Sequence, residues 1–168
     1  MKIIIDQSTI ERTIRRISYE IIEKNHDLTN VVILGIPTRG VVLGNRIATN
    51  IKAIEGVEVA CDILNVRPYR DDLKVPLPKI LPKVDVTNKT VIFVDDVLYT
   101  GRTVRAALDA VMDMGRPAKI YLAVLIDRGH RELPIMANYV GKNIPTGQNE
   151  SILVRFMETD GVEQVVLE

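Results

Sequence analysis

The sequence Val-Ile-Phe-Val-Asp-Asp-Val-Leu-Tyr-Thr-Gly-Arg-Thr, residues 91–103, predicts both the fold and the position of a functional site. Its first four residues are apolar and mostly β-branched, which is typical of a strand buried on both faces. The apolar run ends in two carboxylates and a hydroxyl-bearing turn. Beyond the turn, Val104, Leu108, Val111 and Met112 recur at helical spacing. We therefore expect a strand, a short loop and a helix in succession.

The loop between this strand and this helix has the chemistry of an anion site. Free backbone N–H groups at a helix N-terminus favour a phosphate, Gly101 allows the backbone to approach it closely, and the Thr100 and Thr103 hydroxyls can donate to its oxygens. Asp95 and Asp96 would repel a phosphate, so they suit sugar hydroxyls or a divalent cation. The pattern predicts a ribose 5-phosphate site; the alternative is that the two acids only cap the helix.

Residues 91–103 closely resemble the 5-phosphoribosyl-1-pyrophosphate (PRPP) motif of the type I phosphoribosyltransferase family. The resemblance implies that family's α/β fold, with a central, mainly parallel sheet flanked by helices, a flexible lid loop and a C-terminal hairpin. It also implies that one loop supplies most of the PRPP and nucleotide contacts. These residues are Asp95, Asp96, Val97, Leu98, Tyr99, Thr100, Gly101, Arg102 and Thr103.

Two further strands are predicted to end in polar loops. Residues 31–34 form a buried run that ends in Gly-Ile-Pro-Thr-Arg-Gly, where Thr38 and Arg39 suit a second anionic group. The resemblance matches Thr38, Arg39 and Gly40 to the pyrophosphate loop. It assigns recognition of a uracil edge to backbone groups at Ile126, Asp127 and Arg128, after the third strand. Three such strand ends are typical of a parallel sheet with a site at its carboxyl edge.

Residues 65–88 are predicted to form the lid. They include Pro68, Pro76, Pro78 and Pro82, so they cannot form a regular helix or a central strand. A long segment of this kind inside a compact domain is usually functional. The resemblance implies that it brings a cation to the leaving pyrophosphate, and of Arg67, Arg70 and Lys74 we favour Arg70. The alternative is an ordinary surface loop.

The composition limits the class of protein. A chain of 168 residues fits a single domain, residues 1–168. Lys and Arg together number 22, as do Asp and Glu, so any polyanion site must be a local patch. Cys61, the only cysteine, suits a reduced core residue, and no apolar stretch approaches the roughly 20 residues of a membrane span. We expect a cytoplasmic protein with no membrane partner.

The resemblance extends over nearly the whole chain to those family members that regulate pyrimidine operons by attenuation and are also uracil phosphoribosyltransferases. It implies conversion of uracil and PRPP to UMP and pyrophosphate, with magnesium carried mainly by PRPP and not by protein side chains alone. It also implies binding of UMP or UTP and of pyrimidine-operon leader RNA by a homodimer or homotetramer. The catalytic residues would be Asp95, Asp96 and Arg70, and the RNA-binding residues Arg12, Arg15, Arg16, His130 and Arg131.

Some features depart from this resemblance. The lid is shorter and richer in proline, Met136 stands where relatives commonly have arginine, and Tyr19 stands where they have histidine. Met136 therefore removes one cation from the predicted RNA surface, while a solvated helix face remains the ordinary interpretation of Arg12, Arg15 and Arg16. Two other functions stay open: a nucleotide-sensing RNA-binding regulator with weak or no transferase activity, and a purine or orotate phosphoribosyltransferase.

Overall fold

The structure, a computed structural model, describes residues 1–168 and is organised around a five-stranded parallel sheet of order β3-β2-β4-β5-β6. The order places β4, the strand that carries the paired acids, in the middle of the sheet. The strands are β2 (Val31–Gly35), β3 (Ala60–Ile63), β4 (Thr90–Leu98), β5 (Lys119–Asp127) and β6 (Tyr139–Asn143).

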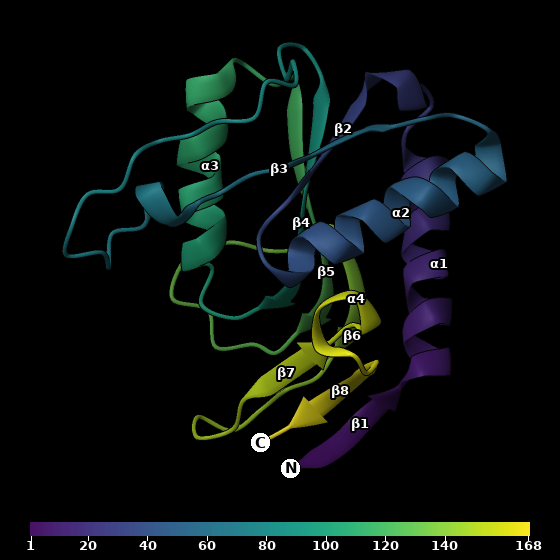
Figure 1. Cartoon of the computed structure of the whole chain (residues 1–168), viewed down its shortest axis with the longest axis vertical. Helices are drawn as coiled ribbons and strands as arrows, with labels where there is room; N and C mark the ends of the chain where they lie inside the picture. The colour runs from purple at the N-terminus through teal and green to yellow at the C-terminus, as the bar shows by residue number, and fades with distance from the viewer.

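Helices cover both faces of this sheet (Figure 1). On one face lie α1 (Gln7–Lys24) and α2 (Arg39–Glu55), and on the other lies α3 (Arg102–Met114). The apolar residues of each helix recur at helical spacing, and the stripes that they form are buried because each faces the sheet. The buried residues include Ile10, Ile14, Ile17, Ile21, Leu43, Ile47 and Ile51 on one face and Val104, Ala107 and Val111 on the other.

A second, smaller sheet is antiparallel and has the order β1-β8-β7. Its strands are β1 (Lys2–Asp6), β7 (Ile152–Arg155) and β8 (Gln164–Leu167), and a single helical turn, α4 (Met157–Asp160), connects β7 with β8. The predicted C-terminal hairpin is therefore confirmed. Because β1 pairs with β8, the two ends of the chain lie side by side (Figure 1).

The structure corrects several details. The central strand does not stop at the acids: β4 continues through Asp95 and Asp96, and its pairing with β5 persists to Leu98. Asp6 caps α1 by accepting a hydrogen bond from the Thr9 N–H at 2.9 Å. Two side chains are less buried than expected, since Met112 is 57% exposed and Cys61 is only partly buried, on edge strand β3.

The segment predicted to be a lid, residues 65–88, contains one short 3-10 turn, η2 (Arg67–Tyr69). The other 3-10 turn of the chain, η1 (Leu28–Asn30), precedes β2. Neither helix nor strand occurs between η2 and β4. Val66 and Val86 are buried against the α3 face, whereas Val75 and Ile80 are 70% and 74% exposed. Both ends of the segment are thus packed on the domain, and its middle projects from it.

None of the helices has the length and apolarity needed to cross a membrane.

Candidate active site

The three predicted loops meet at the carboxyl edge of the parallel sheet. β2, β4 and β5 are parallel neighbours, so their ends at Gly35, Leu98 and Asp127 face the same edge. Backbone hydrogen bonds then join the loops: the Ile36 N–H donates to the Val94 carbonyl at 2.9 Å, and the Arg128 N–H donates to the Leu98 carbonyl at 3.1 Å. The sheet register therefore brings together residues that are distant in sequence.

A cavity of about 150 Å³ occupies this edge beside the loop that precedes α3. Gly101 begins that helix with φ of 93°, a conformation that favours glycine, and it has no side chain to cap the first-turn N–H groups. The Thr100 hydroxyl accepts from the Arg102 N–H at 3.3 Å. The lining residues are Arg70, Asp95, Val97, Leu98, Tyr99, Thr100, Gly101, Thr103, Val104 and Val124.

Most of the predicted nucleotide-binding loop therefore surrounds one cavity, but Asp96 and Arg102 do not line it. The Arg102 side chain lies at the rim, where it pairs with Glu132 at 2.8 Å and Asp71 at 3.4 Å. The free helix N-terminus and the two threonine hydroxyls make this cavity suitable for a phosphate.

Arg70 extends from the lid segment to this phosphate-binding loop. Its Nη1 donates to the Thr103 hydroxyl at 2.8 Å, while Nε and Nη2 each contact the Asp72 carboxylate at 3.0 Å. The hydrogen bond to Asp72 raises the pKa of Arg70, so its guanidinium stays cationic. Arg70 was predicted to serve the leaving pyrophosphate. In the structure it instead contacts the loop that is predicted to bind the 5-phosphate.

The paired acids lie next to this positive region. The Asp95 carboxylate accepts a hydrogen bond from the Asp96 N–H at 2.9 Å. Burial raises the pKa of Asp95 well above its ordinary value, and the neighbouring charge of Asp96 raises it further, against a smaller opposing effect of Arg70. Perturbed acids in a cleft are typical of functional sites. The pair suits hydrogen-bond donors such as a ribose diol, or a divalent cation.

The loop before α2 follows β2, which pairs with β4 on the side opposite β5. A Cβ on Gly40 would lie 2.4 Å from the Val94 carbonyl oxygen and 3.1 Å from the Asp95 Cα, so α2 can begin this close to the acids only with glycine here. Thr38 precedes the helix and its hydroxyl makes no capping bond. Arg39 is held by Asp160, through Nε at 3.2 Å and Nη2 at 2.6 Å.

The third loop contributes a side chain that sequence reasoning did not assign. Arg128 is buried, its guanidinium lies 3.9 Å from the centre of the Tyr99 ring, and its Nε donates to the Thr146 hydroxyl at 3.0 Å. His130 Nε2 lies 2.5 Å from the Thr146 carbonyl oxygen, and its ring faces the edge of Tyr99. Arg128 therefore ties the loop predicted for the base to the loop predicted for the phosphate.

The predicted RNA-binding residues fall into two groups. Arg12 and Arg15 are exposed on α1, and Arg16 pairs with Glu20 and donates to the carbonyl groups of Val140 and Gly141 in β6. The second group lies beyond the end of β5.

In that second group, Arg131 is already engaged. Its guanidinium donates to the carbonyls of Ile135 and Tyr99, at 2.8 and 2.9 Å, and to the Asp127 carboxylate at 2.5 Å. This arrangement braces the third loop against the phosphate loop. The structure thus places Arg131 in an internal network, and no contact joins it to the arginines of α1.

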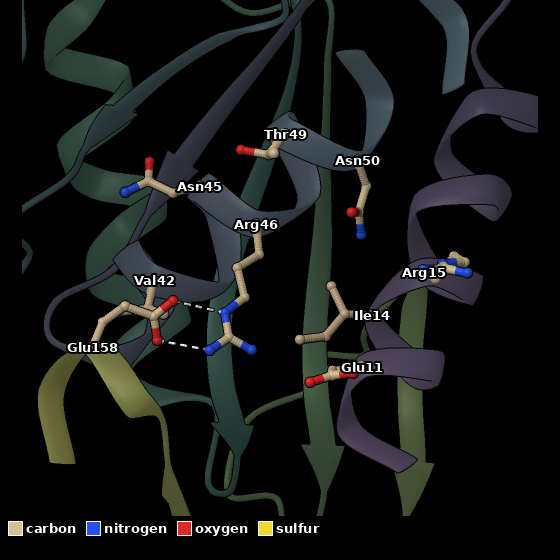
Figure 2. Close-up of a pocket in the computed structure, with 9 residues that line it drawn as sticks. All are labelled: Glu11, Ile14, Arg15, Val42, Asn45, Arg46, Thr49, Asn50 and Glu158. Carbon is tan, nitrogen blue, oxygen red and sulfur yellow. Dashed lines mark hydrogen bonds and ion pairs between the residues drawn. The ribbon is translucent and has the colours of Figure 1, made fainter. Parts of the chain in front are cut away.

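A larger cavity, of about 570 Å³, lies elsewhere, in a groove between α1, α2 and α4 (Figure 2). Figure 2 shows Arg15 and Asn50 along this groove, with Arg46 reaching across it to Glu158. We assign the active site to the smaller cavity at the sheet edge. There the helix N-terminus, Asp95 and Arg70 converge, whereas Arg15 is the only predicted site residue in the groove.

Residues 2–157 match a family model described as the phosphoribosyl transferase domain. The chain is 55% identical over 164 residues to the "Bifunctional protein PyrR" of Streptococcus agalactiae, a match covering 98% of this chain and 95% of that protein. It is 52% identical over 166 residues to the "Pyrimidine operon regulatory protein" of Lactococcus lactis subsp. lactis, covering 99% and 96% of the two chains.

Solved structures of related transferases share the fold. A hypoxanthine phosphoribosyltransferase of Trypanosoma cruzi superposes with a TM-score of 0.80 at 20% identity, covering 99% of this chain and 94% of that one. A hypoxanthine-guanine phosphoribosyltransferase of Bacillus anthracis gives 0.75 at 21% identity, covering 99% and 97%. At these identities the likeness shows the fold alone.

Proposed function

The chain belongs to the phosphoribosyl transferase family and, within it, to the PyrR proteins, and from that membership we propose a double function. The protein binds the leader RNA of a pyrimidine operon in response to uracil nucleotides, and it forms UMP and pyrophosphate from uracil and PRPP. One observation carries the enzymatic part: the acids Asp95 and Asp96 lie near the end of β4, and the short loop after that strand leads into the N-terminus of α3, whose N-cap is Gly101.

Each part of PRPP has a matching place in the site. The first turn of α3, with Thr100 and Thr103, binds the 5-phosphate, because helix N-terminal N–H groups and hydroxyls donate to its oxygens. Asp95 and Asp96 accept hydrogen bonds from the ribose hydroxyls. The pyrophosphate extends toward Arg39, at the start of α2 on the other side of β4.

Uracil is placed at the end of β5, where backbone groups of Ile126, Asp127 and Arg128 are available to its polar edge. Its N1 forms a bond to C1 of the ribose as the bond from C1 to the pyrophosphate oxygen breaks. Pyrophosphate takes the bonding electrons, and the N1 proton passes to solvent. In the transition state, positive charge builds on the ribose ring. The carboxylate of Asp96 therefore stabilises that state electrostatically.

Magnesium accompanies PRPP in this proposal. The carboxylate oxygens of Asp95 and Asp96 would suit a divalent cation that is held mainly by PRPP oxygens. When bound, the ion neutralises charge on the leaving pyrophosphate.

The regulatory part rests on the α1 surface. Arg12 and Arg15 are exposed there and can neutralise RNA phosphates, so RNA affinity falls as salt is added. Met136, 75% exposed, offers no such charge. The nucleotide that the site produces is also the effector that it senses.

Pyrophosphate release from magnesium and PRPP tests the proposal, with uracil compared in parallel with adenine, hypoxanthine, guanine and orotate. We expect release with uracil only. Release with a purine or orotate would replace the substrate assignment. Binding of UMP without release by any base would leave a nucleotide-sensing regulator, and binding of leader RNA, titrated with and without UMP, tests that role separately.

A further inference from the structure

Arg39, the cation predicted to meet the pyrophosphate, is held by a residue near the C-terminus. Asp160 in α4 accepts from Arg39 Nε at 3.2 Å and from Nη2 at 2.6 Å, although 121 positions separate the two residues. The hydrogen bond also raises the pKa of Arg39 and lowers that of Asp160 to about 2, so both groups are charged at neutral pH. A two-point contact of this kind fixes the plane of the guanidinium.

Asp160 is itself held in place. Its Oδ2 accepts from the Phe156 N–H at 2.9 Å and from the Thr159 hydroxyl at 2.8 Å, and its side chain is only 17% exposed. The carboxylate therefore cannot rotate freely when a ligand approaches. It acts as a fixed support for the arginine.

The same turn is attached to α2 a second time, seven residues farther along the helix. Arg46 pairs with Glu158 at 2.7 Å and also with Glu163, and its guanidinium lies 4.9 Å from the centre of the Phe156 ring. Figure 2 shows the contact with Glu158, which faces the groove and not the sheet edge. The second attachment secures α4 without entering the active site.

The first attachment does face the active site. Arg39 is followed by Gly40, which lies so close to β4 that an added Cβ would be 2.4 Å from the Val94 carbonyl oxygen and 3.1 Å from the Asp95 Cα. Asp96 is also close enough for its charge to contribute to the raised pKa of Arg39. With Nε and Nη2 engaged by Asp160, Nη1 is the part of the guanidinium that remains to donate to a phosphate oxygen.

We propose that Asp160 is a positioning residue for the transferase site, holding Arg39 so that its free Nη1 meets the pyrophosphate group of PRPP. The entropy of fixing a long side chain is then lost on folding and not on binding, so PRPP binds more tightly. This inference rests on the proposed function, because it requires Arg39 to contact pyrophosphate. UMP carries no pyrophosphate, so its affinity is independent of Asp160.

The test compares Asp160→Asn with Glu158→Gln, which neutralises the other acid of the same turn. We expect Asp160→Asn to raise the KM for PRPP and the inhibition constant of pyrophosphate about fivefold, the cost expected for ordering one long side chain on binding, while the Kd for UMP stays unchanged. Glu158→Gln should leave all three constants unchanged. In an Arg39→Gln background, Asp160→Asn should cause no further loss.

Equal weakening of PRPP and UMP would show a purely structural role and overturn the inference. So would an unchanged or lower KM for PRPP. If the wild-type chain turned over no base, the transferase proposal would fail, and calorimetric titration of PRPP and of pyrophosphate into wild type and Asp160→Asn would still decide the role of Asp160. Weaker binding of both ligands by Asp160→Asn would support it, and equal or tighter binding would overturn it.

Discussion

The hydroxyl of Thr103 accepts a hydrogen bond of 2.8 Å from Nη1 of Arg70. This contact joins the lid segment to the first turn of α3, where the 5-phosphate is proposed to bind. A phosphate in that turn would meet the Arg70 cation and the Thr103 hydroxyl together. Arg70, near the start of the lid segment, is thus part of the proposed phosphate site.

Replacing Arg70 should therefore weaken PRPP use. We expect Arg70→Gln to lower kcat/KM for PRPP by about 10- to 100-fold, the loss expected for one or two charge-assisted hydrogen bonds. Arg67→Gln is the matched control, because Arg67 is exposed and its guanidinium makes no hydrogen bond. Steady-state kinetics with PRPP varied would decide, and equal effects of the two substitutions would contradict the assignment.

Asp96→Asn should abolish most turnover while leaving the protein folded. The substitution keeps the side chain's shape and removes the negative charge opposite the developing positive charge on the ribose, so we expect kcat to fall about 100-fold. Asp109→Asn, on the exposed face of α3, controls for loss of a carboxylate. Unchanged turnover in Asp96→Asn, with wild-type circular dichroism, would refute the role.

Asp95→Asn should stabilise the fold at neutral pH. Burial raises the folded-state pKa of Asp95, so the penalty for its charge begins as pH rises through about 3.8, the unfolded value, and is complete above the raised folded pKa. The thermal midpoint of the variant should therefore exceed that of wild type near pH 7, and the difference should shrink toward pH 4. A stability difference that did not vary with pH would contradict this origin.

Gly40→Ala should destabilise the domain. Its Cβ would lie 2.4 Å from a backbone oxygen of the central strand, and neither backbone can move without disturbing the packing of α2 on β4. We expect a loss of about 3 kcal/mol in the free energy of unfolding, measured by urea titration. Gly147→Ala should be tolerated, because its nearest neighbour is the flexible end of Glu150 at 3.3 Å.

Met136→Arg should strengthen RNA binding if the surface around the third loop takes part in it. One added phosphate contact would steepen the dependence of log affinity on log salt by about 0.7 to 0.9. Met112→Arg adds the same charge to an exposed position on α3 and should leave the slope nearly unchanged. Equal slopes for the two variants, measured by filter binding, would remove this region from the interface.

Much of this architecture could be predicted because its signals are local. The apolar run at 91–94 identified the central strand, and the spacing of Ile10, Ile14, Ile17 and Ile21 identified the buried face of α1. The loop before α3 was predicted from its own residues, and all of its predicted residues except Asp96 and Arg102 line the cavity. These features depend on neighbours within a few positions of the chain.

Other features depend on contacts between distant residues, and the sequence pattern did not reveal them. β6 was not predicted because it is short and contains Gly141, whose need for glycine appears only against the Leu125 carbonyl, 2.3 Å from the position of a Cβ. The inward course of Arg131 and the capture of Arg39 by Asp160 are likewise tertiary effects. A charged residue in a loop does not by itself indicate which partner it will meet.

The central position of β4 also determines how rigidly the acids are held. Because the strand is hydrogen-bonded to β2 and β5 and covered on both faces, its amide hydrogens should exchange with solvent only when the whole domain unfolds. Amides in the lid segment should exchange far sooner. Slow exchange in β4, around Asp95 and Asp96, therefore provides an internal reference. Ligand-dependent changes in the exchange rates of the surrounding loops can be compared with it by hydrogen–deuterium exchange.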